Sequence, residues 1–255
     1  MIQNPVDRFV YYPMRHPEGD WHLQAGSGAI DFWLKTSDGV ELNAWWFPKL
    51  GTHFATLFLH GNAGNVTHRI NHAEAITSAG ASVLILDYRG YGKNKGRPTE
   101  DGLYRDADAG YDSLLKRGYA PERIVLHGES LGTAVATDLA ARRPCAALIL
   151  ESPMTSLGKM AGTLLPVIGP LFAHGFNTLR KIGRINAPLL VIHGDCDEVV
   201  PFSHGEQLFR SARQPKTFWP VPVPITTICS MSPGKSTAID YARSINRCGG
   251  QADFR

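Results

Sequence analysis

The sequence predicts one α/β domain built on a mostly parallel, doubly wound sheet, and two observations carry this prediction. Short apolar runs of the buried-strand type recur along the chain, and segments with helical character separate most of them. Strands and helices in alternation are typical of a parallel sheet covered by helices. The 255 residues are enough for one such domain, so we expect residues 1–255 to form a single unit.

The predicted elements follow one another in this order. Strands are expected at residues 30–36, 40–47, 55–59, 82–86, 123–126, 146–150, 189–192 and 217–221. Helices are expected at residues 67–78, 100–116, 131–141 and 204–211. The first two strands flank Ser37-Asp38-Gly39, and Asp-Gly between two apolar runs indicates a hairpin. The sheet should therefore begin with an antiparallel pair.

One segment, residues 153–186, interrupts the alternation. It is punctuated by glycine and proline, and its apolar residues are Leu164, Leu165, Val167, Ile168, Leu171 and Phe172. An insertion at this point would lie over the strand ends, where ligands bind in open sheets. We interpret the segment as a small cap, with a buried helix as the alternative.

Composition and charge narrow the function classes. The formal net charge of +3 is spread along the chain, which gives no support for a nucleic-acid-binding surface. The cysteines have neither zinc-site spacing nor the density of a disulfide-stapled domain, and are expected to be reduced: Cys145, Cys196, Cys229 and Cys248. Residues 1–12 show neither a signal peptide nor a membrane-spanning stretch. We expect a cytoplasmic protein without a membrane span, and nothing in the sequence calls for a metal or cofactor.

The strongest chemical motif is Gly128-Glu129-Ser130-Leu131-Gly132, which fits the pattern G-x-S-x-G. It follows the predicted strand 123–126 and precedes the predicted helix 131–141, the strand–turn–helix setting that this motif requires. Gly128 and Gly132 let the backbone turn sharply and leave room around the serine. Ser130 is therefore the candidate nucleophile, and the alternative is a glycine-rich turn with an incidental serine.

A second motif, His60-Gly61-Asn62-Ala63-Gly64-Asn65, stands at the end of the predicted strand 55–59. A tetrahedral intermediate needs two preorganised donors for its oxyanion, and this loop occupies the place that supplies one of them. The candidate donors are the backbone N–H groups of Asn62 and Leu131, with His60 and Gly61 as supporting residues of the loop. Taken alone, such a loop is more often only a turn.

A third motif, His193-Gly194-Asp195-Cys196-Asp197-Glu198-Val199-Val200-Pro201, follows the predicted strand 189–192. The histidine of a serine hydrolase must be held in the correct tautomer by an acid, and this loop carries two candidates. We choose Asp197, two residues before the Val-Val-Pro segment, over Asp195. The alternative is a solvated acidic loop.

Together these motifs resemble the α/β-hydrolase superfamily, in particular its esterase-like and serine-aminopeptidase-like branch. The resemblance runs from about Phe9 to Pro222, with the three motifs in the family order. It implies the α/β-hydrolase fold, Ser130 as nucleophile, Asp197 as orienting acid, and oxyanion donors at Asn62 and Leu131. Residues 87–92, Asp-Tyr-Arg-Gly-Tyr-Gly, resemble the family's D-x-R-G-x-G turn, which we interpret as scaffold and cleft wall.

The catalytic histidine that the resemblance implies is missing downstream of Asp197. The one later histidine, His204, stands at the predicted start of a helix, where packing or capping is expected. His60, His127 and His193 lie at strand ends within motifs, from which any of them could in principle approach Ser130, but each has a better structural explanation.

The tail, residues 222–255, loses the pattern of the preceding chain. A one-base frameshift near the codon of Pro222 would explain this change. Read in the neighbouring frame, the codons of residues 223–228 can encode Ala-Asp-His-Asn-Asp, with the histidine codon straddling Ile225 and Thr226.

Two functions follow as hypotheses. The first is a serine hydrolase that cleaves an ester, thioester or amide of a small-molecule acyl substrate through an acyl-enzyme on Ser130. The apolar cap favours a substrate with a hydrophobic group. The second is a catalytically inactive α/β-hydrolase, lacking its histidine, that binds a small ligand or a protein.

Overall fold

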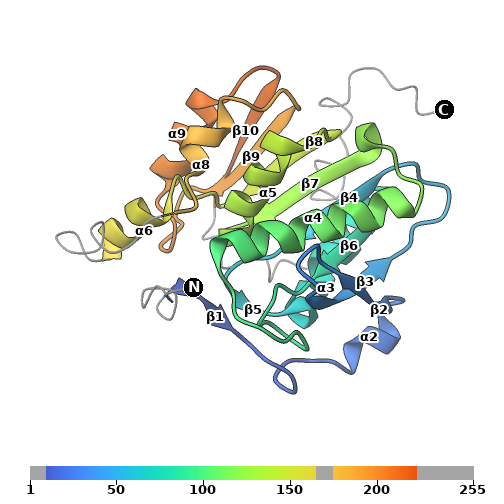
Figure 1. The fold of residues 1–255 in the computed structure, drawn as a ribbon. Coiled ribbons are helices and arrows are strands. Elements are labelled where there is room, and N and C mark those ends of the chain that lie inside the picture. Colours follow the sequence, from blue (N-terminus) through green and yellow to red (C-terminus); the bar gives the residue numbers. More distant parts are fainter. Residues whose placement is uncertain (1–9, 165–174, 223–255) are drawn as a thin grey trace.

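The computed structural model describes residues 10–164 and 175–222, and a mixed sheet forms the centre of this part of the chain (Figure 1). Its strand order within the described residues is β10-β9-β8-β7-β4-β6-β3-β2. The strands are β2 (Ile30–Lys35), β3 (Glu41–Phe47), β4 (Ala55–Leu59), β6 (Ser82–Leu86), β7 (Ile124–Glu129), β8 (Ala147–Glu151), β9 (Leu189–Gly194) and β10 (Lys216–Val221). Two short strands, β1 (Tyr12–Pro13) and β5 (Ala63–Gly64), pair with each other separately.

The sheet begins with the predicted antiparallel hairpin, β2 and β3. Gly39 in its turn has a φ of +85°, a conformation that glycine adopts without steric penalty. β3 also pairs antiparallel with β6, and the remaining neighbouring pairs in this sheet, from β6 to β10, are parallel. These pairings confirm the mostly parallel α/β fold with an N-terminal hairpin.

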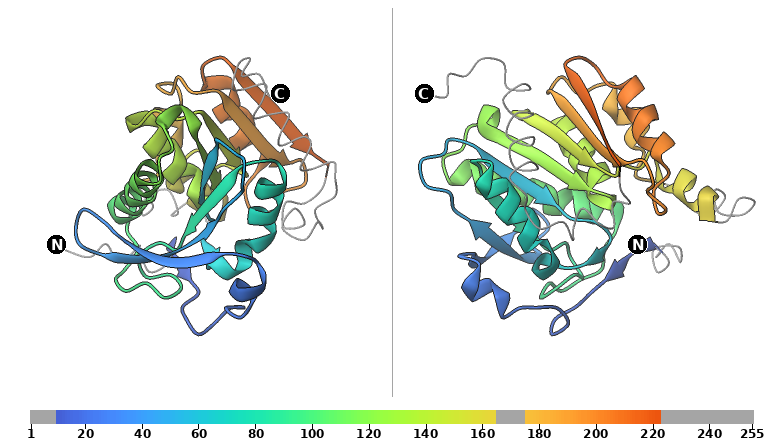
Figure 2. Two further views of the ribbon diagram at one scale, coloured as in Figure 1. Left: turned by 90° about the vertical axis from the view of Figure 1, so that its right-hand side faces the viewer. Right: turned by 180° about the vertical axis from the view of Figure 1, so that it is seen from behind.

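Helices cover both faces of the sheet (Figure 2). Helices α4 (Glu100–Lys116), α5 (Leu131–Arg142), α8 (Thr178–Ile182) and α9 (Phe202–Ser211) contribute buried residues to one face. Helix α3 (Ile70–Ser78), drawn in teal, packs on the opposite face. The remaining helical elements are α2 (Leu23–Gly26), α6 (Leu157–Leu164) and the 3₁₀ turns η1 (Val66–Arg69) and η2 (Pro121–Arg123).

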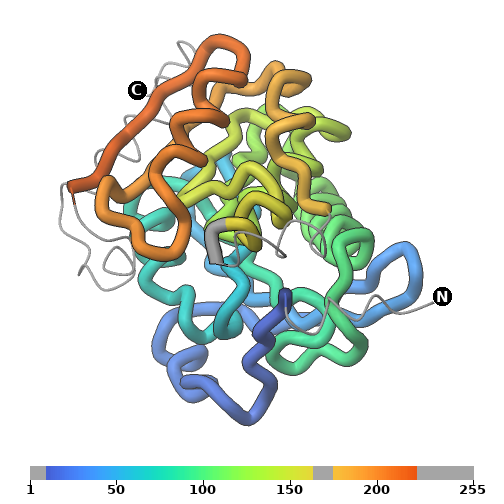
Figure 3. Tube along the Cα trace, turned by 90° about the vertical axis from the view of Figure 1, so that its left-hand side faces the viewer, coloured from blue at the N-terminus to red at the C-terminus, as the bar shows by residue number. Residues whose placement is uncertain are grey.

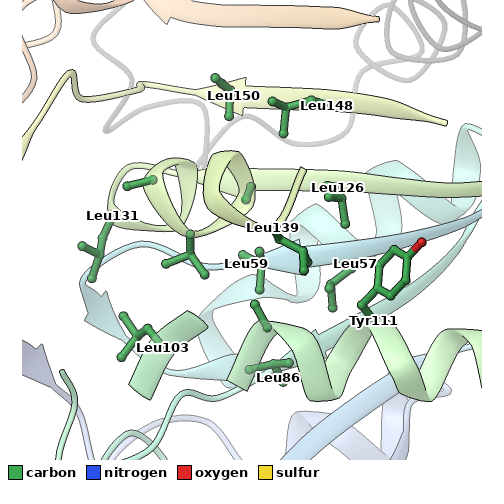
Figure 4. Packing of buried hydrophobic residues seen from close by; sticks show 14 of the residues in the cluster. Leu57, Leu59, Leu86, Leu103, Tyr111, Leu126, Leu131, Leu139, Leu148 and Leu150 are labelled. Atoms are coloured by element: carbon green, nitrogen blue, oxygen red, sulfur yellow. The ribbon is translucent and has the colours of Figure 1, made fainter. Parts of the chain in front are cut away.

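The larger core lies between the sheet and helices α4 and α5 (Figure 4). Leu57 and Leu59 of β4 pack there with Leu131 and Leu139 of α5, all of them buried. Complete burial of such a side chain contributes about 1.5–3 kcal/mol to folding. Because Leu131 directly follows Ser130, this packing anchors the start of α5 and with it the position of the candidate nucleophile.

Several element boundaries differ from the prediction. Strand β7 continues to Glu129, three residues past its predicted end. Helix α9 begins at Phe202 rather than at His204, and the predicted helix 67–78 is divided into η1 and α3. The division lies at Arg69, whose φ of −114° and ψ of 11° are not helical, and Asn65 caps η1 by accepting a hydrogen bond from the Thr67 N–H.

The predicted cap segment, residues 153–186, contains α6 and α8. Met154 and Phe176 are buried at either side of α6, and residues 165–174 lie outside the described part. The role of the segment as a cap stays a prediction.

The tail from residue 223 onward, with Ile225 and Thr226, also lies outside the described residues. No helix in residues 10–164 and 175–222 is long and apolar enough to cross a membrane.

Candidate active site

Ser130 stands at the junction between β7 and α5, at the carboxyl edge of the parallel strands. Its φ of 49° and ψ of −113° are uncommon for any residue other than glycine. A hydrogen bond from the Ser130 N–H to the carbonyl oxygen of Glu151, at 2.8 Å, ties this strained turn to the end of β8. Strain of this kind persists only where the surrounding structure imposes it.

The glycines of the elbow are required by close backbone contacts. A Cβ atom on Gly132 would overlap the carbonyl oxygen of Leu59 and lie 2.8 Å from that of His60. A Cβ atom on Gly128 would lie 2.6 Å from the carbonyl carbon of Gly132. The turn therefore packs backbone against backbone on the end of β4, which leaves space for glycine alone.

The loop of residues 60–65, which we call the oxyanion loop, lies directly against the elbow. A Cβ atom on Gly61 would lie 3.4 Å from the Cβ of Ser130. The side chain of Asn62 accepts from the Tyr12 N–H at 3.2 Å and donates to the carbonyl oxygen of Val10 at 2.6 Å. Figure 3 shows the dark blue start of the described chain, which includes β1, the strand paired with β5 of this loop.

The backbone N–H groups of Asn62 and Leu131, the predicted oxyanion donors, are without a protein acceptor among the described residues. Neither N–H is thus taken up by another group of the described chain, and their role as oxyanion donors stays a prediction. Donors of this kind act through their fixed orientation, because no energy is then spent on reorganisation as charge develops.

The turn formed by residues 87–92 holds the oxyanion loop from the other side. Asp87, fully buried, accepts a hydrogen bond from the Val66 N–H at 2.8 Å and faces the Nε2 of His60 at 3.5 Å. The hydroxyl of Tyr91 donates to the Asn62 side chain at 2.9 Å. The sequence indicates a role as scaffold and cleft wall for this turn, but it does not indicate these contacts, because they join residues twenty or more positions apart.

The carboxylate of Asp197 is hydrogen-bonded within its loop, whereas Asp195 is exposed to solvent. One carboxylate oxygen of Asp197 accepts from the N–H groups of Val199 and Val200, each at 2.9 Å. The other accepts from the hydroxyl of Ser152 at 2.8 Å, and the side chain is only 5% exposed. Three donors therefore fix the orientation of the Asp197 carboxylate, and its role as the orienting acid stays a prediction.

Ser152 also connects the two parts of the site, a role that sequence reasoning missed. It follows Glu151, whose carbonyl oxygen accepts the Ser130 N–H. Ser152 itself has a φ of 48° and donates its N–H to the carbonyl oxygen of Ile192 at 2.9 Å. The two residues after the apolar part of β8 thus join the elbow at Ser130 to β9, the strand that leads into the loop of Asp197.

The described histidines near the strand ends have structural partners. His127 lies 3.3 Å from the carboxylate of Glu151, and His193 lies 2.9 Å from a backbone carbonyl oxygen. His204 accepts a backbone N–H through Nδ1, and burial lowers the pKa of both His193 and His204. Within the described residues, no hydrogen bond joins a histidine to the hydroxyl of Ser130, and no group of His, Cys, Asp and Glu is suited to hold a metal ion.

Comparison with known proteins identifies the family. Residues 52–181, which include the oxyanion loop and the elbow, match the family described as serine aminopeptidase, S33. The chain belongs to this family. It is 40% identical over 223 residues to an uncharacterised protein of Mycobacterium tuberculosis, covering 84% of this chain and 78% of that protein. Human alpha/beta hydrolase domain-containing protein 17B is 38% identical over 203 residues, covering 77% of this chain and 69% of that protein.

Solved structures show the same fold. An esterase from Pyrococcus furiosus superposes with a TM-score of 0.76 at 24% identity, covering 94% of this chain and all of that one. An alpha-beta hydrolase from Vibrio vulnificus superposes with a TM-score of 0.72 at 21% identity, covering 87% and 83%. These likenesses show the α/β-hydrolase fold, and the match to the serine aminopeptidase S33 family shows that the chain is a hydrolase.

Proposed function

We propose that this S33 family member hydrolyses an ester, thioester or amide through an acyl-enzyme on Ser130. The strained position of Ser130 against the oxyanion loop is the observation that carries the proposal. Its Oγ attacks the carbonyl carbon, its proton passes to a histidine base, and the N–H groups of Asn62 and Leu131 stabilise the oxyanion. Collapse expels the protonated leaving group, and water then releases the acid and regenerates the hydroxyl.

Asp197 orients the histidine in this scheme, and the loop after β10 is where the histidine belongs. Val221, the last residue of β10, pairs with Gly194, and its carbonyl oxygen accepts the Asp195 N–H at 3.0 Å. The loop after β10 therefore begins beside the acid loop, which supports this location for the base. The written sequence has Ile225 and Thr226 there, and neither side chain can accept a proton at neutral pH.

We propose that a one-base frameshift near the Pro222 codon removed this histidine. Sequencing the codons of residues 221–226 tests the proposal directly. The restored reading frame would place Gly-Ala-Asp-His-Asn-Asp after Val221. The proposal fails if the neighbouring reading frames of these codons encode no histidine at this place.

The substrate we propose is a small acyl compound with a hydrophobic group. The apolar residues of the predicted cap support this class, and the buried side chains of Met154 and Phe176 lie in that segment on either side of α6. The rings of Tyr11 and Phe176 meet edge to face, with centroids 6.3 Å apart. An apolar surrounding of this kind favours alkyl or aryl groups over charged ones.

A catalytically inactive binder is the second candidate function. One observation favours it: no described histidine is hydrogen-bonded to Ser130. Loss of the histidine from a catalytic triad lowers turnover by about a millionfold. A protein of this kind would keep the site as a binding surface for a small ligand or a protein.

A fluorophosphonate probe separates the two functions. The wild-type chain, Ser130→Ala and the frame-restored version would each be treated with the probe and assayed with short p-nitrophenyl esters. Labelling and hydrolysis by the frame-restored version, with loss of both in its Ser130→Ala variant, support the serine hydrolase. Labelling that persists in Ser130→Ala would overturn the nucleophile assignment, and a frame-restored protein without label or hydrolysis would favour the binder.

A further inference from the structure

The side chain of Glu129, the residue before Ser130, connects the elbow to the oxyanion loop. Its Oε2 accepts a hydrogen bond from the Gly61 N–H at 3.1 Å and another from the Nε of Arg69 at 2.6 Å. Arg69 reaches the same loop, because its Nη2 donates to the carbonyl oxygen of Ala63 at 3.1 Å. One ion pair therefore holds the loop backbone on both sides of Asn62.

This ion pair lies in largely buried surroundings. The side chain of Glu129 is 13% exposed and that of Arg69 is 9% exposed. Hydrogen bonds that involve a charged group are shorter and stronger than neutral ones, and exclusion of water strengthens them further. The ion pair of Glu129 and Arg69 therefore restricts the motion of the oxyanion loop more than an ion pair between exposed side chains would.

The charge of Arg69 is as important as its hydrogen bonds. Burial alone would raise the pKa of Glu129, but the positive charge of Arg69, with His72 and the Gly61 N–H, lowers it below its usual value. The negative charge of Glu151, the residue opposite Glu129 on the neighbouring strand β8, raises the pKa of Glu129 instead. A charged carboxylate next to the elbow would repel an oxyanion formed there, and the guanidinium offsets this repulsion.

We propose that Glu129 and Arg69 are positioning residues that fix the Asn62 N–H relative to Ser130. The catalytic consequence rests on the proposed serine hydrolase function, whereas the positioning of the loop does not. Neither residue touches the reacting atoms in this scheme. Both act through the loop, so their loss should change turnover more than substrate binding.

The test compares Glu129→Gln and Arg69→Gln with a matched control, Arg143→Gln. Arg143 forms an arginine–carboxylate pair with Asp112 at the other end of α5, 2.8 Å apart. Hydrogen–deuterium exchange of a peptide covering residues 60–66 reports the loop, and thermal melting reports the fold. The kcat and KM for p-nitrophenyl acetate are measured on these variants of the frame-restored protein. Hydrogen–deuterium exchange is measured on the same variants of the written chain.

We expect exchange in residues 60–66 to rise about tenfold in the Glu129 and Arg69 variants and to stay unchanged in Arg143→Gln. The kcat should fall about 10-fold to 100-fold with KM changed less than about twofold, since loss of one oxyanion donor costs more than its displacement. Unchanged exchange overturns the proposal whatever the activity, and so does faster exchange with wild-type kcat. If no version hydrolyses the ester or reacts with the fluorophosphonate, the proposed function fails, while the exchange result still decides the positioning role.

Discussion

Replacement of Gly132 by alanine should destabilise the protein through a clash between α5 and β4. The new methyl group would overlap the carbonyl oxygen of Leu59 and lie 2.6 Å from its carbonyl carbon and 2.8 Å from the carbonyl oxygen of His60. These are backbone atoms of a buried strand end, so no side-chain rotation can relieve the contact. Either the helix start or the strand end must move.

The magnitude follows from two opposing effects. Overpacking of a core costs about 1–3 kcal/mol, and contact with backbone on two residues places Gly132 at the upper limit of about 3 kcal/mol. Alanine gains about 1 kcal/mol over glycine in a helix. A net loss of about 2 kcal/mol remains, which for a domain of this size lowers the Tm by about 4–8 °C.

Differential scanning calorimetry measures this change, with Gly26→Ala as the control. Gly26 ends the short helix α2 and is exposed, and a Cβ atom added to it would meet no other atom within 4 Å. Its substitution should leave the Tm within about 1 °C of wild type. If Gly132→Ala also melted within about 1 °C of wild type, the close approach of the elbow to β4 would be refuted.

Three further predictions concern the acid loop and the hairpin turn. In the frame-restored protein, Asp197→Asn should lower kcat about 10⁴-fold, while Asp195→Asn should leave kcat nearly unchanged. If Asp195→Asn lowered kcat and Asp197→Asn did not, the orienting acid would be Asp195. Ser152→Ala should reduce kcat, with wild-type melting, because one oxygen of Asp197 loses its donor; unchanged kcat in a steady-state ester assay would contradict this role. Hydrogen bonds from Arg89 hold the pKa of Asp38 well below its usual value in the folded protein. Asp38→Asn should therefore lower the Tm at pH 7, and the difference should shrink as the pH falls below about 4, because the carboxylate of the unfolded chain is protonated first. A constant difference in Tm across this range would contradict this role.

The elbow and the hairpin could be predicted because their signals are local. G-x-S-x-G between a strand and a helix, and Asp-Gly between two apolar runs, each specify a backbone shape within a few residues. The end of β7 could not be predicted in the same way. His127 and Glu129 interrupt the apolar run, and each is accommodated by partners from other elements: His127 by Glu151, and Glu129 by Arg69.

The supports of the candidate site were missed for the same reason. Asp87 and Ser152 reach their partners only after the strands have been placed side by side, and the D-x-R-G-x-G pattern that begins at Asp87 does not name those partners. Asp197 could be preferred from its position before the Val-Val-Pro segment. Its three hydrogen-bond donors, by contrast, are a property of the folded loop.

The place of β4 in the middle of the sheet has a consequence for folding kinetics. Residues 55–59 pair on one side with β6 and on the other with β7, a strand much later in the sequence. The chain must close a long loop before β7 can add to β4, and pairings of such high sequence separation form slowly. Because Gly132 packs on the end of β4, the geometry around Ser130 should appear only after this step. In refolding experiments, reactivity of the serine should lag behind helix formation.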